Sequence, residues 1–452
     1  MGNSEEKKRL QRIDREHIWH PFTQMKDWID EQPVIISEAK GCFVRDINGR
    51  WYMDGVSSLW VNIHGHRREE INNAIKAQLD KISHSTLLGL ANVPSIELAA
   101  RVIDITPKGL NKVFYSDNGS TSVEVALKMA FQYWRLKGEQ ERDLFIALKE
   151  SYHGDTIGAV SLGGIDIFHA AYGPLLFRTL RAPSPYCYRC QLDMDPGSCK
   201  NECLDEMERL LRDNKGKVAG IVLEPLVQGA GGMICHPEGY LRGVKELSQK
   251  YDTLLILDEV ATGFGRTGRM FACEHEGIEP DILCLSKGIT GGYLPLAVTV
   301  STDDIYDAFL GEYSELKTFF HGHSYTGNQL GCAAAIASLE IFKQDDTLKG
   351  LQPKIEVFRK WMDKVIEFEH VGDARAKGLM GGVELVKDKK SKAEYPLEDR
   401  MGWKVVYKAR EKGLLLRPLG NVIVIMPPLV ITKEDLEQML DTIAVSVREV
   451  TG

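Results

Sequence analysis

A lysine and an aspartate each follow an apolar run in the middle of this chain. Lys287 comes after the run at residues 282–285 and precedes the glycine-rich stretch 288–292, and Asp258 comes after the run at residues 254–257. A lysine and an aspartate at the ends of two buried strands indicate pyridoxal phosphate (PLP) chemistry. The lysine forms a Schiff base with the cofactor, and the aspartate keeps the pyridine nitrogen protonated. Either residue alone is also typical of an ordinary strand end, so the prediction depends on the other segments.

Two further segments are suited to hold such a cofactor. Gly119 and Ser120 lie in a stretch of small residues between a predicted strand and a predicted helix. There, backbone N–H groups and the helix N-terminus favour a phosphate, although a plain helix-capping turn has the same composition. Tyr152 follows the predicted strand at 144–148 and is placed to stack on a flat ring, or simply to pack within its loop.

A different cofactor is suggested by residues 263–268, which match the pattern G-x-G-x-x-G. We reject a dinucleotide-dependent dehydrogenase for three reasons. Residues 258–262 separate the strand from the first glycine, no apolar helical pattern opens at Gly268, and Asp281 precedes a strand instead of ending one.

Two polar features are open to a binding role. His321 and His323 are spaced i, i+2, but no carboxylate accompanies them, so we do not expect a metal there. Arg417 follows a leucine in the C-terminal part, and it would pair with a substrate carboxylate if that part folds over the pocket.

The composition excludes several classes of protein. The chain has 452 residues, with 56 basic and 64 acidic side chains and a formal net charge of -8. This balance argues against nucleic acid or an anionic membrane as the partner. No apolar stretch approaches the ~20 residues that span a bilayer, and the charged N-terminus does not have the pattern of a signal peptide. We therefore expect a cytoplasmic protein.

Cysteine spacing suggests one alternative metal site. Of the nine cysteines, Cys187, Cys190, Cys199 and Cys203 form the pattern C-x2-C-x8-C-x3-C in a segment with the composition of a loop. Thiolates at such spacing bind zinc, in which case the role would be structural. Free thiols in an exposed loop are the favoured interpretation, so we assign no metal. The odd total argues against a disulfide framework.

The residues singled out above require strands to position them, and the central part of the chain provides these. Apolar runs alternate with helical patterns, which predicts an α/β fold with a mostly parallel sheet. The expected strands are residues 113–116, 144–148, 219–223, 253–257 and 282–285. A helix is expected after the first of them, with Val123, Leu127, Ala130, Phe131 and Trp134 on its apolar face. Ligands bind at the carboxyl ends of such strands, where Asp117, Glu224, Asp258 and Lys287 fall.

We expect three regions along the chain. Residues 1–70 form an N-terminal arm and part of a small domain, residues 71–336 form the large cofactor-binding domain, and residues 337–452 complete the smaller α+β domain, with a strand at 422–425.

The chain resembles the class III (ω-type) aminotransferases of PLP fold type I from about residue 19 to residue 428. The segments that carry the resemblance are residues 257–268, with the sequence LDEVATGFGRTG, and residues 286–288, with the sequence SKG. Further segments are most similar to the branch of this family that aminates 8-amino-7-oxononanoate in biotin synthesis. They are residues 19–25, 57–60, 64–66, 152–156, 227–233 and 417–420.

The resemblance implies a role for each matching residue. Lys287 carries the cofactor, Asp258 contacts its ring nitrogen, Tyr152 stacks on its ring, and Gly119 and Ser120 bind its phosphate. Ser324 matches a position that reaches the phosphate of a neighbouring subunit, which implies a homodimer with shared active sites. The substrate-binding positions are Trp60, Phe22, Asp155, Arg266 and Arg417.

One departure leaves the amino donor open. Many family members have a tyrosine where this chain has Phe22, and a proline is common where it has His323. The family includes enzymes that use S-adenosylmethionine and others that use lysine, and we favour the former. The nearest rivals are ω-aminotransferases acting on 4-aminobutyrate, ornithine or a diamine. An aminomutase or decarboxylase of the same fold is the next alternative.

Overall fold

Strands and helices alternate through most of the chain in the computed structural model, which describes residues 2–30 and 33–452. The N-terminal segment contains α1 (Gly2–His17), α2 (Met25–Asp30), β1 (Ile36–Lys40), β2 (Phe43–Asp46), β3 (Trp51–Asp54) and α3 (Ser57–Trp60). The helices of the central part are α4 (Glu69–Leu79), α5 (Val93–Ile105), α6 (Gly119–Leu136), α7 (Ile157–Leu162), α8 (Asp166–His169), α9 (Cys203–Asp213), α10 (Tyr240–Lys250), α11 (Asp303–Ala308) and α12 (Gln329–Gln344). Its strands are β4 (Leu110–Ser116), β5 (Leu144–Leu148), β6 (Thr179–Ala182), β7 (Val218–Leu223), β8 (Val227–Gln228), β9 (Ile234–Cys235), β10 (Leu254–Asp258), β11 (Ile282–Leu285) and β12 (Ala297–Thr302).

The C-terminal part contains α13 (Thr347–Val365), β13 (Val371–Lys377), β14 (Met380–Asp388), β15 (Ala393–Glu394), α14 (Met401–Glu411), β16 (Leu414–Leu415), β17 (Arg417–Leu419), β18 (Val422–Ile425) and α15 (Lys433–Thr451). Short 3-10 helices are η1 (Ala170–Leu175), η2 (Ala272–His275), η3 (Lys287–Thr290), η4 (Tyr313–Glu315) and η5 (Leu397–Asp399).

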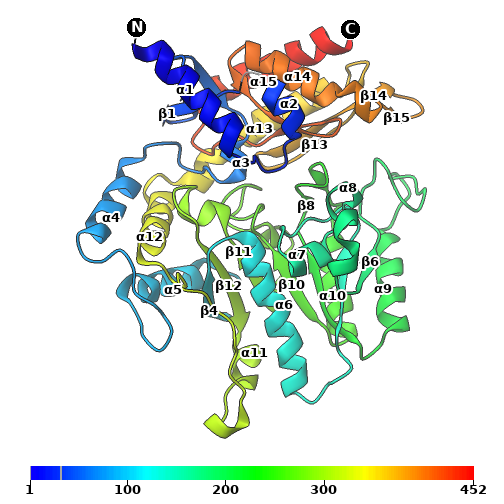
Figure 1. The fold of residues 1–452 in the computed structure, drawn as a ribbon. Coiled ribbons are helices and arrows are strands. Elements are labelled where there is room, and N and C mark those ends of the chain that lie inside the picture. The colour runs from blue at the N-terminus through cyan, green and yellow to red at the C-terminus, as the bar shows by residue number, and fades with distance from the viewer. Residues whose placement is uncertain (1, 31–32) are drawn as a thin grey trace.

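A seven-stranded sheet in the order β4-β12-β11-β10-β7-β5-β6 forms the centre of the fold. Neighbouring strands are parallel except at β12, which runs antiparallel to both β11 and β4. Strands β5, β7, β10 and β11 are buried along their whole length and apolar except for Asp258 at the end of β10, because helices cover both faces of the sheet (Figure 1). The prediction of a mostly parallel α/β sheet is confirmed.

The two ends of the chain lie together beyond one end of the strands of this sheet (Figure 1). β16 adds in parallel to β3 in the sheet β1-β2-β3-β16, so the N-terminal and C-terminal segments share strands. A second sheet, β13-β14-β18-β17, lies beside it, with β15 paired to β14. The limits 1–70, 71–336 and 337–452 for the separate domains stay a prediction.

Helix α6 shows how local sequence positions the site. Asn118 caps the helix by accepting a hydrogen bond from the Thr121 N–H at 3.1 Å, and the Thr121 hydroxyl accepts in turn from the Asn118 N–H at 3.2 Å. Val123, Ala130 and Trp134 are buried against the sheet. Phe131 is 39% exposed, so the expected apolar face of the helix wrongly included this residue. The helix therefore begins directly after β4, at the carboxyl edge of the sheet.

Candidate active site

A cavity of about 470 Å³ lies at the carboxyl edge of the central sheet. The loops that follow β4, β5, β7, β10 and β11 all contribute to its wall. The predicted site residues that line it are Trp60, Gly119, Ser120, Tyr152, Asp258 and Lys287. The parallel direction of the strands explains this convergence, because it places their carboxyl ends at one edge.

Lys287 begins the short helix η3 directly after β11. Its backbone adopts a positive φ of 45°, a conformation that is costly for a residue with a side chain. Its ammonium lies 5.1 Å from the centre of the Trp60 ring, and within the described residues no hydrogen bond of this group is recorded. Burial lowers the pKa of Lys287, and the nearby charges of Asp258 and Glu224 oppose that shift. The lysine is thus partly desolvated and faces the cavity.

Asp258 ends β10, the strand adjacent to β11. Its Oδ2 atom lies 2.8 Å from Nδ1 of His153, and its Oδ1 atom accepts a hydrogen bond from the Val260 N–H at 3.0 Å. Since a carboxylate only accepts, His153 Nδ1 is the donor. Our sequence reasoning missed His153, although its position directly after Tyr152 was a usable signal. The two bonds fix the carboxylate in one orientation.

Glu224 follows β7 and also lines the cavity. Its carboxylate accepts hydrogen bonds from the Tyr152 N–H at 3.1 Å and the Gly229 N–H at 2.8 Å. Burial raises the pKa of Glu224 to about 7. The sequence placed this residue at a strand end but indicated no role for it.

Glu224→Gln should flatten the dependence of stability on pH. Because the folded-state pKa of about 7 lies above the ordinary value of 4.5, the folded chain retains a proton in this window that the unfolded chain has lost. The free energy of unfolding should therefore fall as pH rises from 4.5 to 7, by about 3 kcal/mol for this group. Urea unfolding at several pH values in this range measures the slope. An equal slope in the variant would contradict the raised pKa.

Small residues form the end of the cavity next to α6. The Ser120 hydroxyl accepts a hydrogen bond from the Asp155 N–H at 3.1 Å. A methyl group added at Gly154 would lie 1.9 Å from Ser120 Oγ, and one added at Gly119 would lie 2.5 Å from Val260 Cγ1. The N-terminus of the 18-residue helix α6 is therefore reached closely by neighbouring backbone, and it presents N–H groups and a partial positive charge to an anion.

The chemistry of these groups fits PLP. A partly desolvated amine, an oriented carboxylate, an aromatic side chain and a helix N-terminus with small residues line one cavity. They match the aldehyde, ring nitrogen, ring face and phosphate of that cofactor.

Three other predicted residues lie outside the cavity wall: Asp155 and Phe22 lie beside Tyr152, and Arg417 lies against Phe22. The Tyr152 hydroxyl donates a hydrogen bond to Asp155 at 2.7 Å, and the ring of Phe22 lies 6.5 Å from the Tyr152 ring. Arg417 donates to the Phe22 carbonyl at 3.4 Å, and burial lowers its pKa. The C-terminal part and the N-terminal arm therefore meet at Phe22, near Tyr152, and the role of Arg417 stays a prediction.

Two predicted residues are not brought to the cavity. Arg266 is 1% exposed, and its guanidinium donates to the backbone carbonyls of Pro427 at 2.7 Å and Asn62 at 2.9 Å. It links distant parts of the chain and faces no open space. Ser324 is exposed in a separate loop, where its carbonyl accepts a hydrogen bond from His84 at 2.6 Å.

The cysteine cluster shows free thiols. Cys187, Cys190 and Cys199 are partly buried, Cys203 is buried, and Cys199 donates to Glu202 at 2.9 Å. In the part of the chain that the structure describes, no three His, Cys, Asp or Glu side chains are arranged to hold a metal ion. Among the same residues, no helix is both long and apolar enough to cross a membrane.

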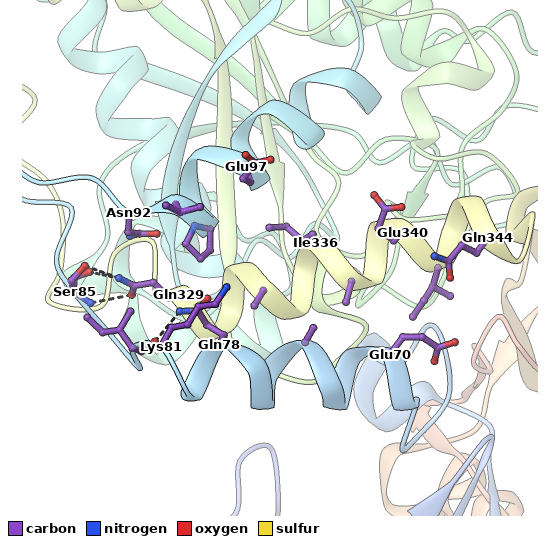
Figure 2. A pocket seen from close by; sticks show the side chains of 17 residues that line it. Glu70, Gln78, Lys81, Ser85, Asn92, Glu97, Gln329, Ile336, Glu340 and Gln344 are labelled. Atoms are coloured by element: carbon purple, nitrogen blue, oxygen red, sulfur yellow. Dashed lines mark hydrogen bonds between the residues drawn. The ribbon is translucent and has the colours of Figure 1, made fainter.

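A second hollow of about 660 Å³ lies between α4, α5 and α12 (Figure 2). Its charged lining residues are Glu70, Lys81, Glu97 and Glu340. None of the predicted site residues lines it, and no glycine-rich loop enters it. This hollow therefore does not compete with the cavity at the carboxyl edge as the catalytic site.

Comparisons with known proteins agree with this geometry. The family described as aminotransferase class-III matches residues 25–447. An adenosylmethionine-8-amino-7-oxononanoate aminotransferase from Geobacter sulfurreducens is 57% identical over 97% of each chain. The crystal structure of the enzyme of the same name from Methanocaldococcus jannaschii is 50% identical, with a TM-score of 0.94 over 98% of this chain and 99% of that one. An amine transaminase from an uncultivated Pseudomonas species, solved in a PLP-bound form, is 34% identical, with a TM-score of 0.91 over 96% of this chain and 99% of its own.

Proposed function

The chain belongs to the class-III aminotransferases, and from that membership we propose that it converts 8-amino-7-oxononanoate to 7,8-diaminononanoate in biotin synthesis. It is a PLP-dependent aminotransferase with the fold that the sequence predicted. Relatives named adenosylmethionine-8-amino-7-oxononanoate aminotransferase support this choice of substrate. They are 50 to 57% identical to the chain and match nearly its whole length.

The structural observation that carries the proposal is the arrangement of Lys287 and Asp258 around one cavity. Asp258 ends β10 and Lys287 follows the adjacent parallel strand β11, with Asp258 opposite Cys284 in the register of the two strands. Lys287 would carry the cofactor, Asp258 would contact its ring nitrogen, Tyr152 would cover its ring, and the N–H groups at Gly119 and Ser120 would bind its phosphate. PLP supplies an aldehyde that accepts an amino group and a ring that stores an electron pair.

Each residue then has a defined task. Lys287, with its pKa lowered by burial, would take a proton from the donor carbon and deliver it to the cofactor's aldehyde carbon. Asp258, oriented by His153, stabilises positive charge on the ring nitrogen. Trp60 and Tyr152, which line the same cavity as the lysine, would restrict the entry of water. Arg417 is the group we propose for the substrate carboxylate, and Asp155 and Phe22 lie where an amino end of the substrate would reach Tyr152.

We propose S-adenosylmethionine as the amino donor, with lysine as the alternative. Phe22 packs on Phe168 at 5.3 Å and on Tyr152, so an apolar ring stands where many relatives carry a hydroxyl. An apolar ring offers the ammonium group of lysine no hydrogen-bond acceptor, whereas it can contact the sulfonium methyl group and the adenosine of S-adenosylmethionine.

We also propose that the protein works as a homodimer. Loops near Ser324 expose large apolar side chains, including Leu88 at 71%, Phe320 at 72% and Tyr325 at 64%. Exposed apolar side chains of this size mark protein interfaces. In such a dimer Ser324 would reach the phosphate site of the second subunit. The substrates are small molecules, and a cytoplasmic location suits a biosynthetic enzyme of this kind.

The cofactor's visible absorbance tests the function and the donor together. S-Adenosylmethionine should bleach the yellow colour of the purified protein, and 8-amino-7-oxononanoate should restore it. Bleaching by lysine alone would keep the reaction and change the donor. Bleaching only by 4-aminobutyrate, ornithine or a diamine would contradict the biotin assignment. Absence of colour after adding PLP would contradict the cofactor assignment.

A further inference from the structure

Trp60 is held at the cavity by an unusual stretch of backbone. Residues Ser57, Ser58, Leu59 and Trp60 all have positive φ values, of 51°, 51°, 79° and 70°. None is a glycine, and the left-handed region is unfavourable for each of them. Four consecutive residues in this region form a left-handed turn, which we call the Trp60 turn, and it persists only if surrounding groups hold it.

Asp54 supplies most of those holding contacts. Its Oδ1 atom accepts hydrogen bonds from the backbone N–H groups of Val56 at 3.2 Å and Ser58 at 3.0 Å, and its Oδ2 atom accepts from the Ser58 hydroxyl at 3.0 Å. The residue is 3% exposed. His66 stands 3.5 Å from Oδ2, beyond hydrogen-bonding distance but close enough to interact with its charge. A buried carboxylate with two bonds from Ser58 and one from Val56, directly before the turn, is well suited to fix its shape.

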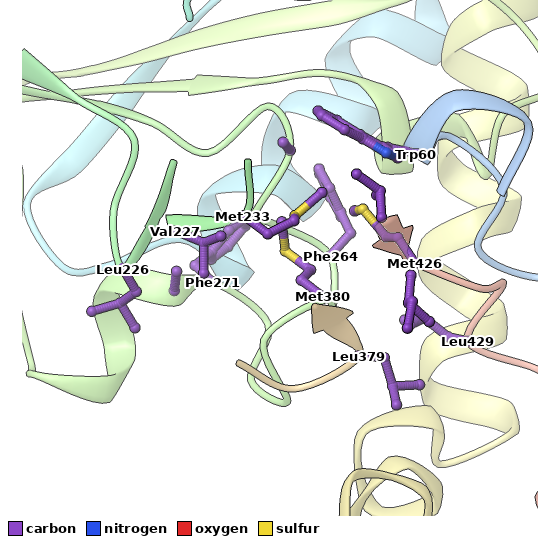
Figure 3. Packing of buried hydrophobic residues seen from close by; sticks show 14 of the residues in the cluster. Trp60, Leu226, Val227, Met233, Phe264, Phe271, Leu379, Met380, Met426 and Leu429 are labelled. Carbon is purple, nitrogen blue, oxygen red and sulfur yellow. The ribbon is translucent and has the colours of Figure 1, made fainter. Parts of the chain in front are cut away.

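The far side of the turn is attached to the C-terminal part. The Ser57 hydroxyl donates to the Met426 carbonyl at 2.6 Å, and the Met426 N–H donates to the Gly55 carbonyl at 2.9 Å. Figure 3 shows Trp60 at the edge of the buried apolar cluster, next to Met426. The turn is therefore held from both sides.

The consequence of the turn is the position of the indole ring. Trp60 is 8% exposed, and its ring lies 5.1 Å from the Lys287 ammonium. On the other side it packs against Gly229, where an added methyl group would lie 3.1 Å from Trp60 Cζ3. The indole therefore lies close to both the lysine and the backbone of the loop after β8, and a relaxed turn would withdraw it.

We propose that Asp54 is a positioning residue that sets the width of the substrate channel by holding the Trp60 turn in its left-handed form. Asp54 does not line the cavity, so it acts through Trp60. The kinetic part of this inference rests on the proposed function, whereas the position of Trp60 can be measured without any substrate.

A double-mutant cycle between Asp54 and Trp60 tests the proposal on the holoenzyme. Asp54→Ala should raise KM for the keto substrate about tenfold and change kcat less than about twofold, because it removes a binding surface and no reacting group. In a Trp60→Ala background the same substitution should change KM less than about twofold, since the residue through which it acts is gone. Equal effects in both backgrounds would overturn the proposal.

Acrylamide quenching of tryptophan fluorescence supplies the readout that is independent of activity. The difference between each protein and its Trp60→Phe partner isolates the signal of Trp60, which should become more accessible in Asp54→Ala. Ser58→Ala removes only the bond from the Ser58 hydroxyl to Asp54. It should change quenching and KM in the same direction as Asp54→Ala but by a smaller amount. It replaces Asp54→Ala in the test if that variant does not fold. Leu59→Gly, which suits a positive φ, should leave both unchanged. Unchanged quenching in Asp54→Ala and Ser58→Ala would overturn the proposal even if transamination of this substrate is confirmed.

Discussion

Lys287→Ala should abolish turnover while leaving the fold intact. The substitution removes both the amine that carries the cofactor and the base that moves the proton, so kcat should fall by at least about 10⁴-fold. The side chain makes no recorded hydrogen bond among the described residues and lies against a cavity, so its loss leaves no buried partner unsatisfied. Removal of a desolvated charge should leave the free energy of unfolding unchanged or slightly higher.

Lys354→Ala is the matched control for this prediction. Lys354 is also partly buried with a lowered pKa, but it donates to the Leu429 carbonyl at 2.7 Å and does not line the cavity. It should retain activity. Borohydride reduction followed by peptide mass spectrometry should attach the cofactor to Lys287 in the parent protein and to no peptide in Lys287→Ala. Turnover within tenfold of the parent would refute the assigned role.

The central strands could be predicted because their sequence is sufficient to define them. A strand that is apolar at every position is stable only where both of its faces are buried. The apolar runs at 144–148 and 282–285 coincide with the buried strands β5 and β11. We did not predict β12 or its antiparallel direction. The direction of β12 is set by the connection through residues 286–296, which turns the chain back beside β11, and no residue within β12 encodes that path.

The same distinction between local and distant information applies to the site. Asp258 and Lys287 could be assigned to one cavity because both fall at strand ends, which are local features of the sequence. The environment of Arg266 was not predictable, because its carbonyl partners at residues 60, 62 and 427 are brought to it only by the packing of the two ends of the chain. The left-handed Trp60 turn was equally hidden, since none of its residues is a glycine.

Asp258→Asn should reduce kcat by roughly 10² to 10⁴-fold with a much smaller change in KM. The amide keeps the size of the carboxylate, and its single oxygen can still accept from the Val260 N–H. Its NH2 group then faces His153 Nδ1, which accepts when the imidazole carries its proton on Nε2, so the geometry should persist. What is lost is the negative charge that favours a protonated ring nitrogen, and one unit of pKa corresponds to about 1.4 kcal/mol. The defect should therefore appear in the proton-transfer step and not in substrate binding.

Replacement of the cofactor provides the sharpest control for this argument. A PLP analogue methylated at the ring nitrogen carries a permanent positive charge, so it should recover much of the activity of Asp258→Asn and none of the activity of Lys287→Ala. Asp281→Asn alters another largely buried carboxylate, one that precedes β11 at the opposite edge of the sheet and accepts from the Leu255 N–H at 2.6 Å. It should destabilise the fold without a comparable loss of kcat. If the analogue fails to rescue Asp258→Asn while the variant remains folded, the carboxylate acts by orienting neighbouring groups, and His153 becomes the residue through which that effect must be traced.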